Sequence, residues 1–216
     1  MNEKNNITEM VFILDRSGSM GGLESDTIGG FNAMIGNQKK EEGKAYVTTV
    51  LFDNEYEVLH DRLELSEVPQ MTDKDYTVRG CTALLDAVGK TIRHISDVHR
   101  YIRAEDVPAH TIFVITTDGL ENASHEFSYS EIKELIGAKK KEGWEFLFIG
   151  ANIDAAEEAA RMGIQRENAA NYVADGIGTA AVFHAVSATT GFLRRNGKIN
   201  QGWQTSIEAD NKRRSK

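Results

Sequence analysis

The sequence lacks several features that define particular classes of protein. It contains one cysteine, Cys81, so no disulfide can form within the chain. It contains only two prolines, and no Pro- or Gly-rich linker or internal repeat divides it. No stretch approaches the roughly 18 consecutive apolar residues of a membrane span, and the opening MNEKNNITEM is polar, without the apolar core of a signal peptide. We therefore expect a cytoplasmic chain that does not engage a membrane.

The composition is that of a single globular domain with an uneven charge. The 216 residues are 40% apolar and 27% charged, which suits one domain with its own core. The net charge of −8 argues against nucleic acid as a partner. Residues 194–216 carry seven basic and two acidic side chains, a net +5, so the first 193 residues carry a net −13. We predict one domain over residues 7–192 and interpret residues 193–216 as a polar, basic, solvated C-terminal tail.

The hydrophobic pattern predicts alternating strands and helices. Three near-continuous apolar runs, MVFIL, TIFVITT and WEFLFIG, are typical of strands buried on both faces of a parallel sheet. Two further strands, AYVTTVLF and YEVLHDR, flank a short turn and predict a hairpin, and NYVA predicts an edge strand. Apolar residues spaced three or four apart predict helices over about 25–40, 82–102, 129–141, 154–162 and 176–192. This order predicts an α/β fold: a mostly parallel central sheet with one antiparallel edge strand and helices on both faces.

Oxygen-bearing side chains gather where two of these strands end. Asp15 follows the first strand and Asp118 follows TIFVITT, and ligands of open α/β sheets bind beyond the carboxyl ends of the strands. Ser17 and Ser19 stand at alternate positions after Asp15, which in an extended loop turns all three side chains to one side. Thr82, at the start of a predicted helix, reaches the same edge. These five hard oxygen ligands, without sulfur or imidazole, suit Mg²⁺.

The pattern DRSGS at 15–19, followed by Thr82 and Asp118, resembles the metal-ion-dependent adhesion site of von Willebrand factor type A domains. That motif is Asp-x-Ser-x-Ser, then a distant Thr, then a distant Asp after a strand, and all five positions match. The contexts FILDRSGSM, GCTALLDAV and ITTDGLEN resemble those of stand-alone bacterial members. The resemblance covers about residues 7–192 and implies a Rossmann-like fold.

The resemblance also implies a function. In similar domains the serines, the threonine and the aspartates hold Mg²⁺, with Mn²⁺ or Ca²⁺ as substitutes, directly or through water. An Asp or Glu of a partner protein completes the metal's coordination. The implied activity is regulated protein binding, and intracellular members often work beside AAA+ ATPases.

Other interpretations of the same residues stay open. Asp15, Ser17 and Ser19 also suit a turn that caps the next helix, Thr82 suits a helix N-cap, and Asp118 suits a simple turn. A Mg²⁺-dependent hydrolase or phosphatase is the alternative function, because such enzymes also use strand-end crevices. The sequence lacks a second Asp two residues after Asp15, a Gly-x-Ser-x-Gly elbow and a P-loop lysine. We therefore predict no enzymatic activity.

Neighbouring residues receive simpler interpretations. We expect Cys81 to be a small buried side chain, and we interpret the six histidines as structural or surface residues. We interpret Glu121 and Asn122 as ordinary polar loop residues, with a role in selecting a partner as the alternative.

Overall fold

The computed structural model describes residues 6–214 and contains one six-stranded sheet. The strands are β1 (Thr8–Asp15), β2 (Ala45–Phe52), β3 (Tyr56–Glu64), β4 (His110–Thr117), β5 (Glu145–Gly150) and β6 (Ala169–Asn171). The α-helices are α1 (Glu24–Gln38), α2 (Leu84–Tyr101), α3 (Tyr129–Lys141), α4 (Ala155–Arg161), α5 (Gly176–Asn196) and α6 (Thr205–Arg214). The strand order is β3-β2-β1-β4-β5-β6, and only edge strand β3 is antiparallel to its neighbour. The predicted α/β architecture is confirmed.

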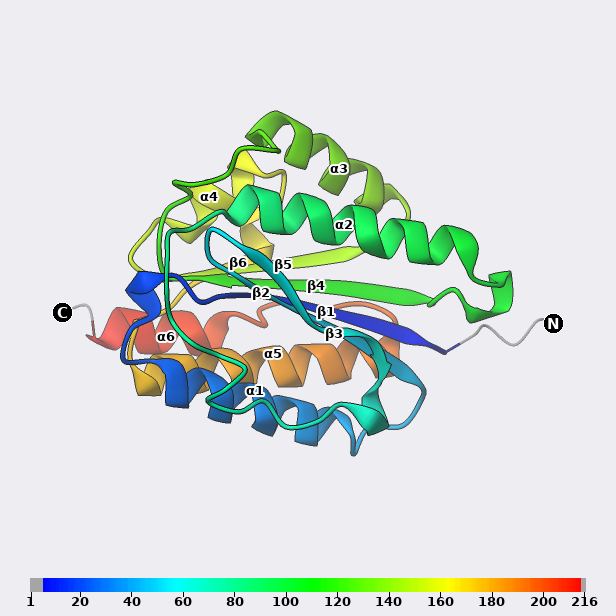
Figure 1. Ribbon diagram of the computed structural model, residues 1–216. Helices are drawn as coiled ribbons and strands as arrows, with labels where there is room; N and C mark the ends of the chain where they lie inside the picture. The colour runs from blue at the N-terminus through cyan, green and yellow to red at the C-terminus, as the bar shows by residue number, and fades with distance from the viewer. Residues whose placement is uncertain (1–5, 215–216) are drawn as a thin grey trace.

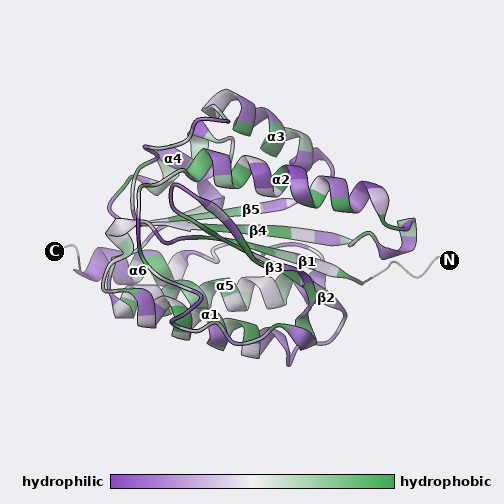
Figure 2. Ribbon diagram, viewed as in Figure 1, coloured by the Kyte–Doolittle hydropathy of each residue, from purple (hydrophilic) through white to green (hydrophobic). Residues whose placement is uncertain are grey.

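Helices cover both faces of the sheet (Figure 1). Helices α2, α3 and α4 lie on one face, and α1, α5 and α6 lie on the other. Each face has its own core: Phe12, Phe31 and Phe183 belong to the α1–α5 side, while Phe113 and Phe146 belong to the α2–α3 side. The hydrophobic colour in Figure 2 runs along the strands between these layers. Burial on both sides explains why β1, β4 and β5 are near-continuous apolar runs.

The parallel register brings the ends of β1 and β4 level. Thr8 pairs with His110, and the pairing continues in step to Leu14 and Thr116. Asp15 and Thr117 therefore end neighbouring strands at the same edge of the sheet. This is the edge at which the sequence predicts the metal site.

The interpretation of residues 193–216 as a solvated tail is wrong for the described part of that segment. Helix α5 continues to Asn196, and α6 packs against α5 and β6. Trp203 and Ile207 are 5% and 1% exposed and belong to the core of the α1–α5 side. The indole of Trp203 also donates to the carbonyl of Glu167 at 3.0 Å. Two apolar anchors in a polar segment bring the helix onto the domain, while Ser215 and Lys216 lie outside the described residues.

Two smaller expectations also need correction. Strand β6 covers 169–171, so the predicted strand at 171–174 lies too late in the chain. Cys81 is exposed, not buried as we expected.

Helix α5 alone among the described helices is long and apolar enough to cross a membrane by length and composition. However, 61% of that stretch is buried in the protein, as suits the core helix it forms beside α1.

Candidate metal centre

Asp15 is a fully buried carboxylate held in a defined orientation. It ends β1, a central strand, and is 0% exposed. Its Oδ1 accepts the backbone N–H of Ser17 at 2.7 Å, and its Oδ2 accepts the Thr117 hydroxyl at 2.6 Å. The buried Tyr76 hydroxyl donates to the backbone carbonyl of Asp15. Strand end, carboxylate and carbonyl are thus all restrained before any ligand arrives.

Hydrogen bonds link the side-chain oxygens of the two serines and Asp118 next to this carboxylate. The hydroxyls of Ser17 and Ser19 are 3.1 Å apart, and Ser19 donates to Asp118 Oδ1 at 2.5 Å. The loop achieves this with a 3-10 turn over residues 18–20, not with the extended backbone that we expected. Ser17 is extended, with φ −65° and ψ 168°, and the turn then brings Ser19 back beside it.

Thr82 completes the group from the far side of Gly119. A methyl group placed on Gly119 would lie 3.4 Å from Ser19 Oγ and 3.6 Å from Thr82 Oγ1, so both hydroxyls border this glycine. Thr82 precedes the N-cap of α2, which is Ala83. The interpretation of Thr82 as a helix cap is therefore wrong. Its backbone is held instead by Asn122, whose side-chain oxygen accepts the Thr82 N–H at 2.9 Å.

The structure thus brings all five predicted residues together. Asp15, Ser17, Thr82 and Asp118 are 0–3% exposed, and Ser19 is open to solvent. Burial raises the pKa of Asp15, although hydrogen bonds from Thr117 and Ser17 oppose this, and the nearby Asp118 carboxylate adds to it. Burial likewise raises the pKa of Asp118. Both shifts have one cause: negative charge lies in a poorly solvated place.

The donor set fits a hard divalent cation. Asp118 Oδ2 is buried and has no hydrogen-bond partner among the described residues. The groups bonded to the two carboxylates are hydroxyls and a backbone amide, and none carries a positive charge. A buried polar atom without a partner costs stability unless something outside the chain satisfies it. Carboxylate and hydroxyl oxygens are the ligands that Mg²⁺ takes.

Several residues that support the site were not predicted. Arg16 is 2% exposed, and its side chain turns away from Asp15 to bond Asp53 at 3.0 Å. Arg79 bonds the same Asp53 oxygen at 2.8 Å. Asp53 therefore ties the loop that precedes Thr82 to the loop that follows Asp15. These contacts join residues 37 and 26 positions apart in the sequence, so no local pattern indicates them.

Glu121 and Asn122 form the inner support of the rim. Glu121 accepts the backbone N–H of Leu85 at 2.9 Å, in the first turn of α2, and also those of Ala123 and Ser124. Asn122 donates its own N–H to the carbonyl of Thr82 at 3.0 Å. Loop polarity therefore has a defined purpose here, which is to hold the start of α2 against the loop that follows Asp118.

Known structures share this architecture. Proximal thread matrix protein 1 from the mussel byssus superposes with a TM-score of 0.62 at 16% identity, over 86% of this chain and 46% of that chain. The von Willebrand factor domain of the type V pilus tip protein Mfa5 from Porphyromonas gingivalis gives a TM-score of 0.60 at 12% identity, over 89% and 98%. This chain has a von Willebrand factor type A fold. No family model and no curated protein matches the sequence.

Two structures of this fold carry metals. One structure of the mussel protein has a zinc-occupied adhesion-site motif, with a TM-score of 0.57 at 12% identity, over 85% of this chain and 46% of that chain. The TRAP protein of Plasmodium vivax was solved loaded with manganese, with a TM-score of 0.56 at 18% identity, over 83% and 74%. The chain spans less than half the length of the mussel protein. At these identities the likeness establishes the fold alone.

Proposed function

We propose that the chain is a divalent-metal-dependent protein-binding module. Mg²⁺ is held by Asp15, Ser17, Ser19, Thr82 and Asp118 and receives a carboxylate from a partner protein. The observation that carries this proposal is the buried oxygen of Asp118, which has no partner in the described part of the chain and lies near a second buried carboxylate. The metal supplies the positive charge that the site lacks and an open position for an outside ligand.

The five side chains contribute to metal binding in two ways, as charged ligands and as neutral ligands. The two aspartates offset the dication, and the neutral hydroxyls of the serines and Thr82 add ligands without adding charge. Ser19 is the exposed member, so the partner approaches from its side. From the sequence resemblance we propose an Asp or Glu of the partner as the incoming group and an AAA+ ATPase as the partner class. We propose the cytoplasm as the location from the single cysteine and the polar first residues of the sequence.

The described residues that surround Asp15 and Asp118 favour binding over catalysis. Their hydrogen-bond partners are hydroxyls and backbone groups, with no histidine or lysine to act as a general base. The alternative, a Mg²⁺-dependent phosphatase, is open to a direct assay. Phosphomonoester turnover that disappears in Asp15→Ala would defeat the binding proposal.

Calorimetry with Mg²⁺ and with Mn²⁺ tests the metal site. We expect saturable binding to the wild-type chain and an affinity lower by about tenfold or more in Ser17→Ala, since even outer-shell changes cost that much. Ser130→Ala is the matched control, because Ser130 is exposed on α3. Absence of binding to the wild-type chain would remove the proposal. Equal affinities for the two variants would remove Ser17 from the ligand set.

A further inference from the structure

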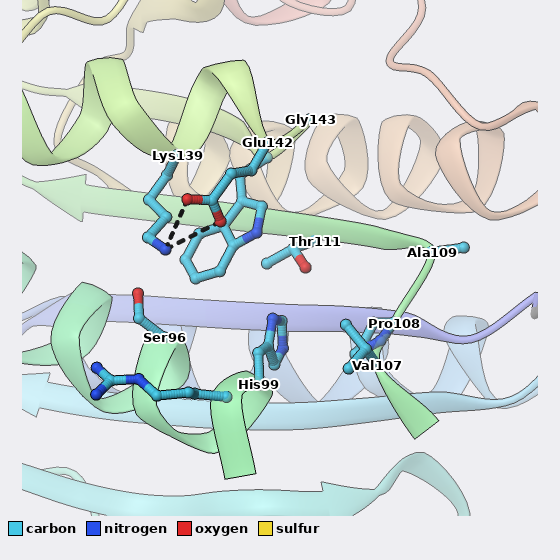
Figure 3. Close-up of a pocket in the computed structure, with 11 residues that line it drawn as sticks. Ser96, His99, Val107, Pro108, Ala109, Thr111, Lys139, Glu142 and Gly143 are labelled. Carbon is cyan, nitrogen blue, oxygen red and sulfur yellow. Dashed lines mark hydrogen bonds and ion pairs between the residues drawn. The ribbon is translucent and has the colours of Figure 1, made fainter. Parts of the chain in front are cut away.

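A pocket lies at the other end of the sheet from the candidate metal centre. Figure 3 shows the side chains that line it. Its volume is about 420 Å³, within the range of small-ligand sites. Thr111, near the start of β4, lines it, whereas Asp118 follows the end of the same strand. Seven residues of strand place the two sites roughly 20 Å apart. A ligand here does not touch the metal centre.

Three elements form the walls of this pocket. Ser96 and His99 enter from α2, and Lys139 and Glu142 enter from the end of α3, while residues 107–109 close the side next to β4. Figure 3 shows the α2 and α3 side chains facing each other across the space. Trp144 lines the inner wall and is 7% exposed. The pocket thus combines charged and aromatic side chains on rigid elements.

One side chain that lines this pocket, His99, has a buried polar atom without a hydrogen-bond partner among the described residues. His99 Nε2 is buried, makes no hydrogen bond to residues 6–214, and lies 3.6 Å from Glu9 Oε2. Glu9 is 0% exposed, and its Oε2 also accepts a hydrogen bond from Arg62 at 2.9 Å, whereas its Oε1 has no hydrogen-bond partner among the described residues. The indole of Trp144 makes ring contacts with Phe113 and Lys139, and within the described residues its N–H donates to no acceptor. Polar groups without a partner beside a cavity indicate that a ligand or water from solution supplies their missing hydrogen bonds.

The charges on the walls favour a ligand of negative charge. Arg100 and Lys139 line the pocket against one acid, Glu142, so the lining residues are net positive in a chain of net charge −8, and Arg100 also bonds Asp97 outside the lining at 2.7 Å. Lys139 directs two hydrogen bonds at the Glu142 carboxylate, at 3.0 and 3.1 Å. An ammonium has three donors, so one remains for a ligand. The Trp144 N–H is a further donor on the pocket lining.

We propose that this pocket binds a small organic anion through a carboxylate or phosphate group. The Lys139 ammonium and the Trp144 N–H donate to the anion's oxygens, His99 contacts it from α2, and Arg100 adds positive charge at the opening. Charge-assisted hydrogen bonds of this kind are among the stronger polar interactions of proteins. This site is separate from the metal centre, and its occupation does not depend on the function proposed above.

Fluorescence of Trp144 provides the test. The chain has two tryptophans, so Trp203→Phe leaves Trp144 as the sole reporter, and calorimetry on the unaltered chain checks each result. Citrate and inorganic phosphate are the two probes, with sodium chloride at matched ionic strength as the reference. We expect a saturable response to at least one probe: citrate alone identifies a carboxylate site, and phosphate alone identifies a phosphate site.

Two lysine variants make the test specific. Lys139→Gln should weaken binding of the responding probe by about tenfold or more. Lys141→Gln removes the same charge two residues away, from an exposed position outside the pocket, and should leave the affinity unchanged. The proposal is overturned if neither probe gives a saturable response by either method, or if both variants change the affinity equally.

Discussion

Replacing Asp118 by asparagine separates the metal's contribution to stability from that of the fold. In Asp118→Asn the side-chain oxygen that accepts the Ser19 hydroxyl is kept, and the negative charge is removed. Because Asp118 is 2% exposed and lies near a second buried carboxylate, its charge is unfavourable without a cation. Without metal, we therefore expect the variant to be at least as stable as the wild-type chain.

With metal the order reverses. At a free Mg²⁺ concentration of about 100 times Kd, binding to the folded state stabilises it by about 2.7 kcal/mol. For a chain of this size each kcal/mol raises Tm by roughly 2–4 °C, so the wild-type chain should gain roughly 5–11 °C. A variant whose affinity is about 100-fold lower should gain only about 1–2 °C at the same concentration.

Thermal unfolding followed by circular dichroism, with Mg²⁺ and then with EDTA, measures both effects. Asp73→Asn is the matched control, because Asp73 is exposed and its loss of charge should leave the metal response intact. A full metal-induced shift in Asp118→Asn would show that this carboxylate does not hold the metal. A large loss of stability in the EDTA-treated variant would show that the buried charge is already compensated within the chain.

Three further substitutions test the framework around the site. Trp203→Ala should destabilise the chain by about 3–5 kcal/mol in urea unfolding, because it removes a 5% exposed indole and leaves the Glu167 carbonyl without its donor. Tyr76→Phe should cost about 1 kcal/mol and weaken Mg²⁺ binding in calorimetry, because the hydroxyl that restrains the Asp15 carbonyl is lost. Burial lowers the pKa of His60 below 6.5, so the unfolded chain takes up this proton first as the pH falls. The contribution of neutral, buried His60 to the free energy of unfolding is therefore complete above about pH 6.5 and is lost progressively as the pH falls below that value. Between pH 7.5 and 5.5, His60→Gln should lose less stability than the wild-type chain.

A control variant and two contradicting outcomes accompany these predictions. Tyr101→Phe removes a hydroxyl from a side chain that is 80% exposed and should change neither stability nor metal affinity. A loss below about 1 kcal/mol in Trp203→Ala would restore the interpretation of the C-terminal segment as a solvated tail. Parallel losses of stability on acidification in His60→Gln and wild-type chains would assign the acid sensitivity to other groups.

Residue order was sufficient to predict the sheet and the helices that cover it. Continuous apolar runs require burial on both faces, and three- to four-residue spacing requires one buried helix face, so both patterns are local consequences of the core. The same local chemistry placed Asp15 and Asp118 at strand ends. Their proximity followed from one general rule, that the carboxyl ends of neighbouring parallel strands meet at one edge.

The errors arose where distant contacts override local composition. Residues 197–214 are polar on average, yet Trp203 and Ile207 suffice to dock a helix, and only the surface offered by α5 and β6 decides that. Likewise the exposure of Cys81 depends on where its loop lies against residues far away in the chain.

The support of the candidate site is also a property of the tertiary structure. Asp53 accepts hydrogen bonds from two arginines in different loops, and Tyr76 donates a hydrogen bond to Asp15, which lies 61 residues away in the sequence. The hydrogen bonds of such groups have no periodicity, because they depend on where separate loops meet. The sequence thus specifies which oxygens are present and that they follow strands. Only the folded chain decides that one buried oxygen of Asp118 has no partner within residues 6–214, since that depends on every neighbour at once.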